Sequence, residues 1–172
     1  MASSVRGTFT TPAGDQIALD WPLSLDLTPH CEVAEAANVS AEQEIRFWWN
    51  DTIRHTLDMF EDLRFVLNTA GIVDYMPLSS VERTKEYNEK IGGIPGSHHT
   101  TGEAFDWNFS QGGLRVRMTN ALRKQISAIW AYVCRKNGVV GYICWYTSGF
   151  HFDAATDGEF KIYDYRGTER DW

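Results

Sequence analysis

The composition of the chain is that of a single soluble domain. It has 172 residues, of which 43% are hydrophobic and 23% charged, and its formal net charge is −7. This length and balance exclude a disordered tail, a fibre and a multidomain protein. Because acidic residues outnumber the scattered basic ones, we expect no nucleic-acid partner and no insertion into a membrane.

The cysteines and the amino terminus indicate where the chain is made. None of the three cysteines stands in a CxxC pair, so we expect buried thiols rather than a structural zinc site or a redox centre. No stretch reaches the roughly 20 apolar residues of a transmembrane helix, and the first residues lack the apolar core of a secretory signal. We therefore expect synthesis in the cytoplasm without a signal peptide.

Residues 1–40 are predicted to form an arm or small hairpin ahead of the main domain. Proline and glycine interrupt this segment repeatedly, at Pro12, Gly14, Pro22 and Pro29. These breaks leave room only for short extended pieces. We place the main domain at residues 41–172.

Two amphipathic helices are predicted. Ser40 and Gln43 form a capping box, which indicates that a helix follows over 41–68. A second helix is expected over 114–135, ended by Gly138, because apolar residues recur there at steps of three and four. The apolar stripe of the first helix consists of Trp49, Ile53, Leu57, Phe60, Leu63 and Leu67.

The remaining segments predict a small sheet. A short strand is expected at 72–76, followed by a long loop that ends at Gly96. Segments 139–146, 149–153 and 160–165 are rich in β-branched and aromatic residues, so we expect three antiparallel strands. The fold class is therefore α+β, with helices packed on one face of a small antiparallel sheet.

Two histidines and a carboxylate form a candidate metal site. His99 and Asp106 stand seven residues apart, and His151 follows far downstream at a strand end. Hydrolytic zinc sites use three such protein ligands and keep a fourth position open. Gly102 would let the loop between His99 and Asp106 fold back, because it lacks a Cβ. From spacing alone, a histidine between two phenylalanines, such as His151, is more often a core or strand histidine than a metal ligand.

The same loop resembles a known family signature. The pattern Ser97-x-His99-x-x-Gly102-x-Ala104-x-Asp106 is similar to that of the zinc D-alanyl-D-alanine carboxypeptidase family. That family includes D-Ala-D-Ala dipeptidases and phage L-alanyl-D-glutamate endolysins, and it is structurally related to the amino-terminal Hedgehog domain. The likeness spans roughly residues 42–166. It also rests on flanking landmarks, which are Ser80 to Thr84, Asn88, Gly92-Gly93, Gly141-Tyr142, Tyr146, Phe150 to Asp153, Arg166 and Trp172.

The resemblance implies a zinc metallopeptidase with a Hedgehog/D-Ala-D-Ala peptidase-like fold. It implies that Zn²⁺ is bound by His99, Asp106 and His151. Arg83 would polarise the scissile carbonyl or anchor a substrate carboxylate, and Ser97 would steady the loop or contact substrate. Without the resemblance, Arg83 reads as a surface salt bridge to a neighbouring glutamate, and Ser97 as a hydroxyl that bonds its own backbone.

The general base is where the sequence departs from the family. Catalytic members commonly carry Glu or Asp three residues before the last histidine, and this chain has Ser148 there. Candidate replacements are Asp153, which lies on the same strand face as His151, and His98 or Glu103 in the loop. We favour Asp153. The alternative is that Asp153 fixes the tautomer of His151 and does not act on substrate.

Aromatic residues, 13% of the chain, gather near these ligands in the sequence. Strand alternation sends half of them into the core, and the rest, Tyr146 among them, would wall a substrate cleft. Trp48 and Trp49 are expected to lie within the first helix and to serve as packing residues. The residues that flank the ligands are Phe105, Trp107, Trp145, Tyr146, Phe150 and Phe152.

Two functions follow from the resemblance. The first is a hydrolase that cleaves the peptide stems of bacterial peptidoglycan, as a bacteriophage endolysin or a virion-associated lysin. It would act at the cell wall or in the periplasm, and its amino-terminal arm could dock tail or baseplate proteins. The second is a structural or binding component of the virion that keeps the fold but has lost catalysis, as Ser148 suggests.

Overall fold

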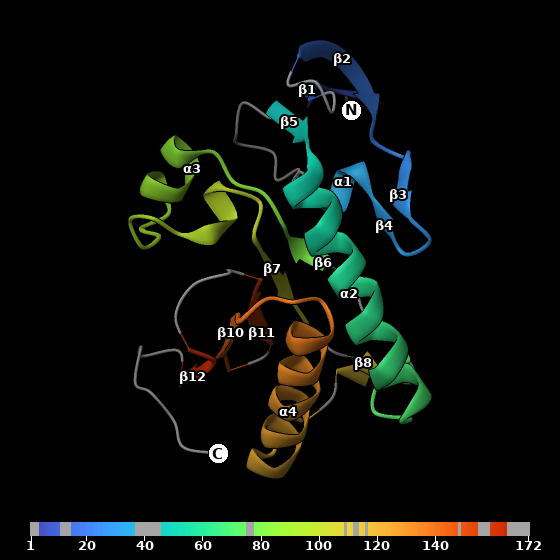
Figure 1. The fold of residues 1–172 in the computed structure, drawn as a ribbon, viewed down its shortest axis with the longest axis vertical. Helices are drawn as coiled ribbons and strands as arrows, with labels where there is room; N and C mark the ends of the chain where they lie inside the picture. Colours follow the sequence, from blue (N-terminus) through green and yellow to red (C-terminus); the bar gives the residue numbers. More distant parts are fainter. Residues whose placement is uncertain are drawn as a thin grey trace.

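The computed structural model describes most of the chain (Figure 1). The described residues are 4–10, 15–36, 46–74, 78–108, 110–111, 114–115, 117–147, 149–154 and 159–164. Several features singled out in the sequence lie outside this part: the capping box of Ser40 and Gln43, and also Ser148, Arg166 and Trp172. Within it, helices and small sheets give an α+β fold, as predicted.

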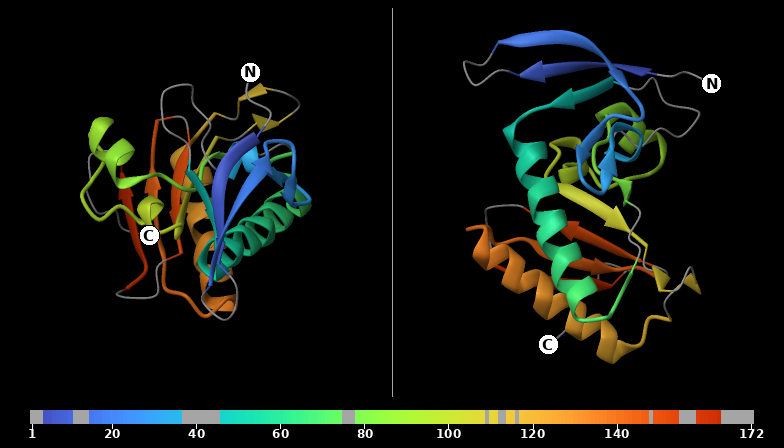
Figure 2. Two further views of the ribbon diagram at one scale, coloured as in Figure 1. Left: turned by 90° about the horizontal axis from the view of Figure 1, so that it is seen from above. Right: turned by 90° about the vertical axis from the view of Figure 1, so that its right-hand side faces the viewer.

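The amino-terminal segment forms a hairpin that joins a later strand. Strands β1 (Ser4–Thr10) and β2 (Gln16–Pro22) are antiparallel, and β5 (Arg46–Trp49) adds to β1 in parallel. This small sheet lies at one end of the molecule (Figure 2, right). The predicted hairpin is therefore present, and its first strand also pairs with a segment beyond residue 40.

The segment after the hairpin contributes to the core. Strands β3 (Asp26–Thr28) and β4 (Cys31–Glu32) lead into the short helix α1 (Val33–Ala36). Cys31 is buried as predicted, and Val33 and Ala36 are buried in the same apolar cluster as the main helices. The Ala36 carbonyl accepts a hydrogen bond from the amide of Glu82. The domain boundary at residue 40 stays a prediction.

Helix α2 (Asp51–Thr69) begins ten residues later than predicted. Asn50 caps it, because its side chain accepts a hydrogen bond of 2.9 Å from the amide of Ile53. The prediction was wrong at Trp48 and Trp49, which lie in β5, since bulky aromatic residues favour a strand. The predicted stripe is otherwise buried, at Ile53, Leu57, Phe60, Leu63 and Leu67.

The stretch between α2 and the candidate metal-site loop contains more regular secondary structure than predicted. Residues 72–74 form no strand, and the strand β6 (Leu78–Ser80) lies in what was expected to be a loop. The same predicted loop contains helix α3 (Lys85–Lys90), which is capped by Thr84. The sequence does carry this signal, since a threonine three residues before Tyr87 can accept from that amide.

The main sheet has the strand order β12-β10-β11-β7-β6. Strand β11 (Phe150–Asp153) lies between β10 (Tyr142–Trp145) and β7 (Ala104–Trp107) and is antiparallel to both. The prediction was wrong for β12 (Lys161–Asp164), which pairs with β10 in parallel. Because β10 and β7 pair with the two edges of β11, β12 pairs with the remaining edge of β10. It runs antiparallel to β11 in direction and is therefore parallel to β10.

Helix α4 (Asn120–Lys136) also begins later than predicted. Leu114 lies in β9 (Leu114–Arg115), which pairs with β8 (Ser110–Gln111), and Thr119 caps the helix. Its end agrees with the prediction, because Gly138 has a φ of 71° just past the last turn. None of the described helices is long and apolar enough to cross a membrane.

One face of the main sheet carries an aromatic core. Phe60 of α2 and Trp130 of α4 pack against Phe105, and Trp130 also packs against Phe152. Phe105, Trp107, Trp145, Phe150 and Phe152 are all buried, so these residues do not wall a cleft as some were expected to. Figure 2 (left) shows α2 and α4 together on one side of the sheet and α3 on the other.

Candidate metal centre

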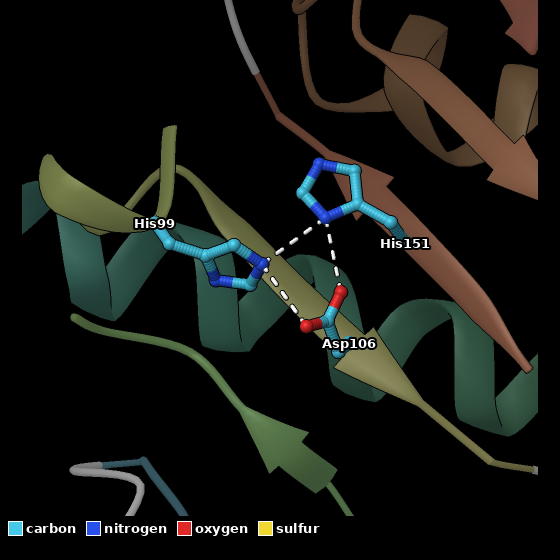
Figure 3. Close-up of side chains that lie close together, drawn as sticks. All are labelled: His99, Asp106 and His151. Carbon is cyan, nitrogen blue, oxygen red and sulfur yellow. Dashed lines mark hydrogen bonds and ion pairs between the residues drawn. The ribbon is translucent and has the colours of Figure 1, made fainter. Parts of the chain in front are cut away.

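His99, Asp106 and His151 meet on the other face of the sheet (Figure 3). They come from the 3-10 turn η1 (His98–Thr100), from β7 and from β11. Nε2 of His99 lies 3.1 Å from Nδ1 of His151 and 3.2 Å from Oδ2 of Asp106. Nδ1 of His151 lies 3.0 Å from Oδ1 of Asp106. One ligand atom of each residue thus lies within 4.8 Å of the others.

Strand register and one glycine build this cluster. His151 and Asp106 are directly opposite each other on β11 and β7, so their side chains share a face of the sheet. The turn at Gly102 brings His99 back over that face. Gly102 has a φ of 78°, and a Cβ there would lie 2.4 Å from Cγ1 of Ile53, so both conformation and space require glycine.

Each histidine has its second ring nitrogen engaged away from the cluster. Nδ1 of His99 donates a hydrogen bond of 2.8 Å to the carbonyl of Val81, which leaves the Nε2 lone pair facing the cluster. Nε2 of His151 lies 3.7 Å from Oδ2 of Asp153, and its Nδ1 faces the cluster. The Val81 carbonyl was missed from sequence, because a backbone acceptor carries no residue signal.

Electrostatics at the cluster favour a cation. Burial raises the pKa of Asp106, but its contacts with His151 and His99 outweigh this effect and hold that pKa well below the ordinary value. Burial lowers the pKa of His99. Burial also opposes charge on His151, yet the hydrogen bonds to Asp106 and Asp153 raise its pKa to about 9. Two carboxylates therefore stabilise positive charge here, whether on a proton or on a metal ion.

Arg83 adds a fixed positive charge to the edge of the cluster. Its guanidinium donates to Oδ2 of Asp106 and, through Nε, to Oγ of Ser80 at 3.2 Å. Its backbone amide donates to the carbonyl of His99 at 3.0 Å. The side chain is 16% exposed, so Arg83 is only partly buried beside the cluster. Arg83 therefore pairs with the candidate ligand Asp106 and not with a neighbouring glutamate, and its role toward substrate stays a prediction.

Asp153, the favoured general base, lies behind His151. Its side chain is completely buried, with Oδ2 2.5 Å from Nδ1 of His98. It contacts the ring nitrogen of His151 that points away from the cluster. This position favours the alternative in which Asp153 orients the imidazole. Of the other two candidates, His98 contacts Asp153, and Glu103 accepts a hydrogen bond of 2.6 Å from Thr101 in the turn.

The two predicted substrate contacts differ in their settings. Ser97 precedes η1, where its carbonyl accepts from the amide and hydroxyl of Thr100. Tyr146 follows β10 and is 39% exposed, so it is the one ligand-flanking aromatic residue that reaches the surface. Burial of the phenol and then the charge of Asp106 raise its pKa, which keeps the hydroxyl a donor at neutral pH.

A family comparison agrees with this geometry. The profile of the peptidase M15 family matches residues 26–139, which include Arg83, His99 and Asp106. The chain belongs to the peptidase M15 family. Members of this family are zinc-dependent peptidases. No curated protein and no solved structure matched the chain.

The residues of this M15 chain suit zinc. Two imidazole nitrogens and a carboxylate oxygen are the mixed donors of hydrolytic zinc sites, which keep one position open. Both histidines also have the partner on the other ring nitrogen that metal-ligating histidines usually have. The donor set therefore fits the metal that the family uses.

Proposed function

We propose that this M15 protein is a zinc-dependent peptidase that cleaves the peptide stems of bacterial peptidoglycan, as a phage endolysin or virion-associated lysin. The observation that carries the proposal is the convergence of His99, Asp106 and His151 within 4.8 Å. The family supports a peptidase, and the loop signature around Gly102 supports this substrate class. Substrate would be reached at the cell wall or in the periplasm.

The proposed roles follow from the contacts in the cluster. Zinc held by the three ligands would supply a Lewis acid and lower the pKa of water. Arg83 is permanently charged and partly exposed beside Asp106, so it is suited to bind the scissile carbonyl or a substrate carboxylate. Tyr146 is 39% exposed as a residue and its phenol is protonated, so it is suited to donate to the peptide backbone.

A second function is favoured by the position of Asp153. The family's usual position for the general base carries Ser148, which is not a carboxylate. The carboxylate favoured as its replacement, Asp153, is buried behind His151. A protein of this kind could bind zinc and a peptide stem without cleaving it. It would then serve as a structural or binding component of a phage tail or baseplate, docked through its amino-terminal arm.

Digestion of purified peptidoglycan tests the proposal. The zinc-loaded wild-type protein is expected to release free amino groups, and mass spectrometry of the products identifies the bond that is cut. His99→Ala is expected to lose both zinc and activity. His55→Ala, the same change on α2 outside the cluster, is the matched control and is expected to keep both.

Each other outcome has a defined meaning. Equal zinc in wild type and His99→Ala would overturn the ligand assignment. Wild-type protein that binds zinc but releases no amino groups would overturn catalysis and favour the second function. Activity on unrelated peptides but not on peptidoglycan would overturn the substrate class while keeping the peptidase.

A further inference from the structure

Asp153 is a buried carboxylate that contacts His98 and His151 on the metal-site face of the sheet. It stands two residues after His151 on β11, so the two side chains point to the same face. Its side chain has no exposed surface. An unpaired carboxylate in such a place would cost several kcal/mol, so its partners determine what it does.

Two side chains besides His151 hold this carboxylate in place. Nδ1 of His98 lies 2.5 Å from Oδ2 of Asp153, so the ring nitrogen and the carboxylate are in direct hydrogen-bond contact. Tyr142 stands directly opposite Asp153 on the neighbouring strand β10, and its ring lies against those of His98 and His151, with centroid distances of 6.0 and 5.7 Å. The carboxylate is therefore fixed from η1 and from β10.

The third contact reaches the metal ligand itself. Oδ2 of Asp153 lies 3.7 Å from Nε2 of His151, while Nδ1 of the same ring lies 3.0 Å from Asp106 (Figure 3). The negative charge favours a proton on Nε2, and a proton there leaves the lone pair on Nδ1 for a metal ion. It also raises the basicity of the ring as a ligand.

The adjacent histidines of the loop therefore have different partners. His99 points into the cluster, and its rear nitrogen donates to the neutral carbonyl of Val81. His98 points to Asp153, the residue behind the other ligand. His99 is thus one ligand, and its neighbour His98 supports the other ligand through Asp153. That second ligand, His151, follows His99 by 52 residues.

We propose that Asp153, fixed by His98 and Tyr142, is a positioning residue that holds His151 with Nδ1 directed at the metal. The inference rests on the metal site of the proposed function and not on its substrate. It predicts that the carboxylate acts on zinc affinity, whether or not the protein cleaves peptidoglycan.

Zinc affinity of Asp153→Asn, measured by competition with a chromogenic chelator, tests the proposal. We expect affinity to fall about 10–100-fold, as for other partners of ligating histidines. Asp164→Asn is the matched control, because Asp164 is also buried and lies on β12 of the same sheet. It is expected to bind zinc like wild type. Circular dichroism and thermal unfolding check that each variant folds.

A pair of substitutions at His98 gives a second test that does not remove the buried carboxylate. His98→Ala removes the donor and is expected to weaken zinc binding in the same direction. His98→Asn is expected to recover most of the affinity, because its amide nitrogen occupies about the place of Nδ1. Rescue by asparagine would not be seen if His98 acted only through its bulk.

The outcomes separate this inference from the proposed function. If Asp153→Asn binds zinc within about threefold of wild type, or if the two His98 variants bind zinc equally, the positioning role is overturned. A zinc-binding but inactive wild type would overturn only the peptidase. A wild type that binds no zinc would overturn both.

Discussion

Gly102 lies at the point where the chain turns from one metal ligand toward the next. The amide of Glu103 donates to the carbonyl of His98 at 2.9 Å, which closes the turn. The positive φ at Gly102 and the side chain of Ile53 against it leave no room for a Cβ. Because Gly102 has a hydrogen atom where alanine has a methyl group, the chain can turn here and bring His99 close to Asp106 in space.

Gly102→Ala is predicted to destabilise the protein and weaken zinc binding together. The positive φ costs about 1 kcal/mol for alanine. The contact with Ile53 adds about 1–3 kcal/mol of overpacking. Gly71→Ala is the control, because Gly71 has a φ of 67° but nothing within 4 Å of the added Cβ. Urea unfolding that gives equal losses for both variants would contradict the packing argument.

Helix α2 shows how a cap decides where a helix begins. The apolar spacing that predicts α2 is present, yet the residues before Asn50 form β5, which pairs with β1. Asn50 is extended at its own φ and ψ and satisfies the amide of Ile53. The cap and the strand partner together place the helix start, and both are stronger than helical spacing alone.

Asn50→Ala is predicted to lower the free energy of unfolding by about 1 kcal/mol, because the amide of Ile53 loses its acceptor. Asn50→Asp is expected to keep most of the stability, since aspartate also caps helices. The measurement is urea unfolding at neutral pH. A loss equal to that of Asn50→Ala in the aspartate variant would show that the cap is not the cause.

Asp62 of helix α2 forms hydrogen bonds to the carboxyl end of helix α4. Its oxygens accept from Nζ of Lys136 at 2.6 Å and from Nδ2 of Asn137 at 2.9 Å. Burial alone would raise the pKa of Asp62, but the hydrogen bonds from Asn137 and Lys136 outweigh it and lower that pKa. The carboxylate form is thus favoured in the folded protein.

This pKa shift predicts a small pH dependence of stability. Because the folded pKa lies below the unfolded one, the contribution is fully present above the ordinary aspartate value of 3.8 and is lost as the pH falls below it. Asp62→Asn should therefore lose stability at neutral pH and lose less than wild type on acidification. Asp51→Asn, at an exposed position of α2, is the control. Equal acid sensitivity of wild type and Asp62→Asn would contradict the assignment.

At the scale of the whole molecule, the main sheet separates packing from chemistry. Phe105 and Asp106 are neighbours in sequence, but strand alternation sends the first to the aromatic core and the second to the metal cluster. The same holds for His151 and Phe152 on β11. A rigid core on one face thus fixes the positions of the ligands on the other.

Truncations are predicted to locate the boundary of the stable unit. A chain that starts at residue 26 keeps Cys31, Val33 and Ala36 in the core, whereas one that starts at residue 41 loses them. Burial of a valine side chain alone contributes roughly 1.5–3 kcal/mol. The shorter chain should therefore have a clearly lower unfolding temperature. Equal unfolding temperatures of the two chains would show that residues 26–40 form a dispensable arm.

The sequence alone determined the chemistry of the candidate site and much of the local structure. His99 and Asp106 are visible in the signature and His151 in a downstream landmark. Gly138 ends a helix through its own conformational freedom, and the stripe from Ile53 to Leu67 is a local periodicity. Such features depend on neighbouring residues, so they can be found without the fold.

Only the tertiary structure decided how these parts meet. The parallel pairing of β12 depends on which edge β7 leaves free, and the start of α2 follows a strand that pairs with β1. The place of Asp153 behind His151 depends on His98 and Tyr142, which lie on different elements. Long-range pairing sets these features, and a single sequence does not record it.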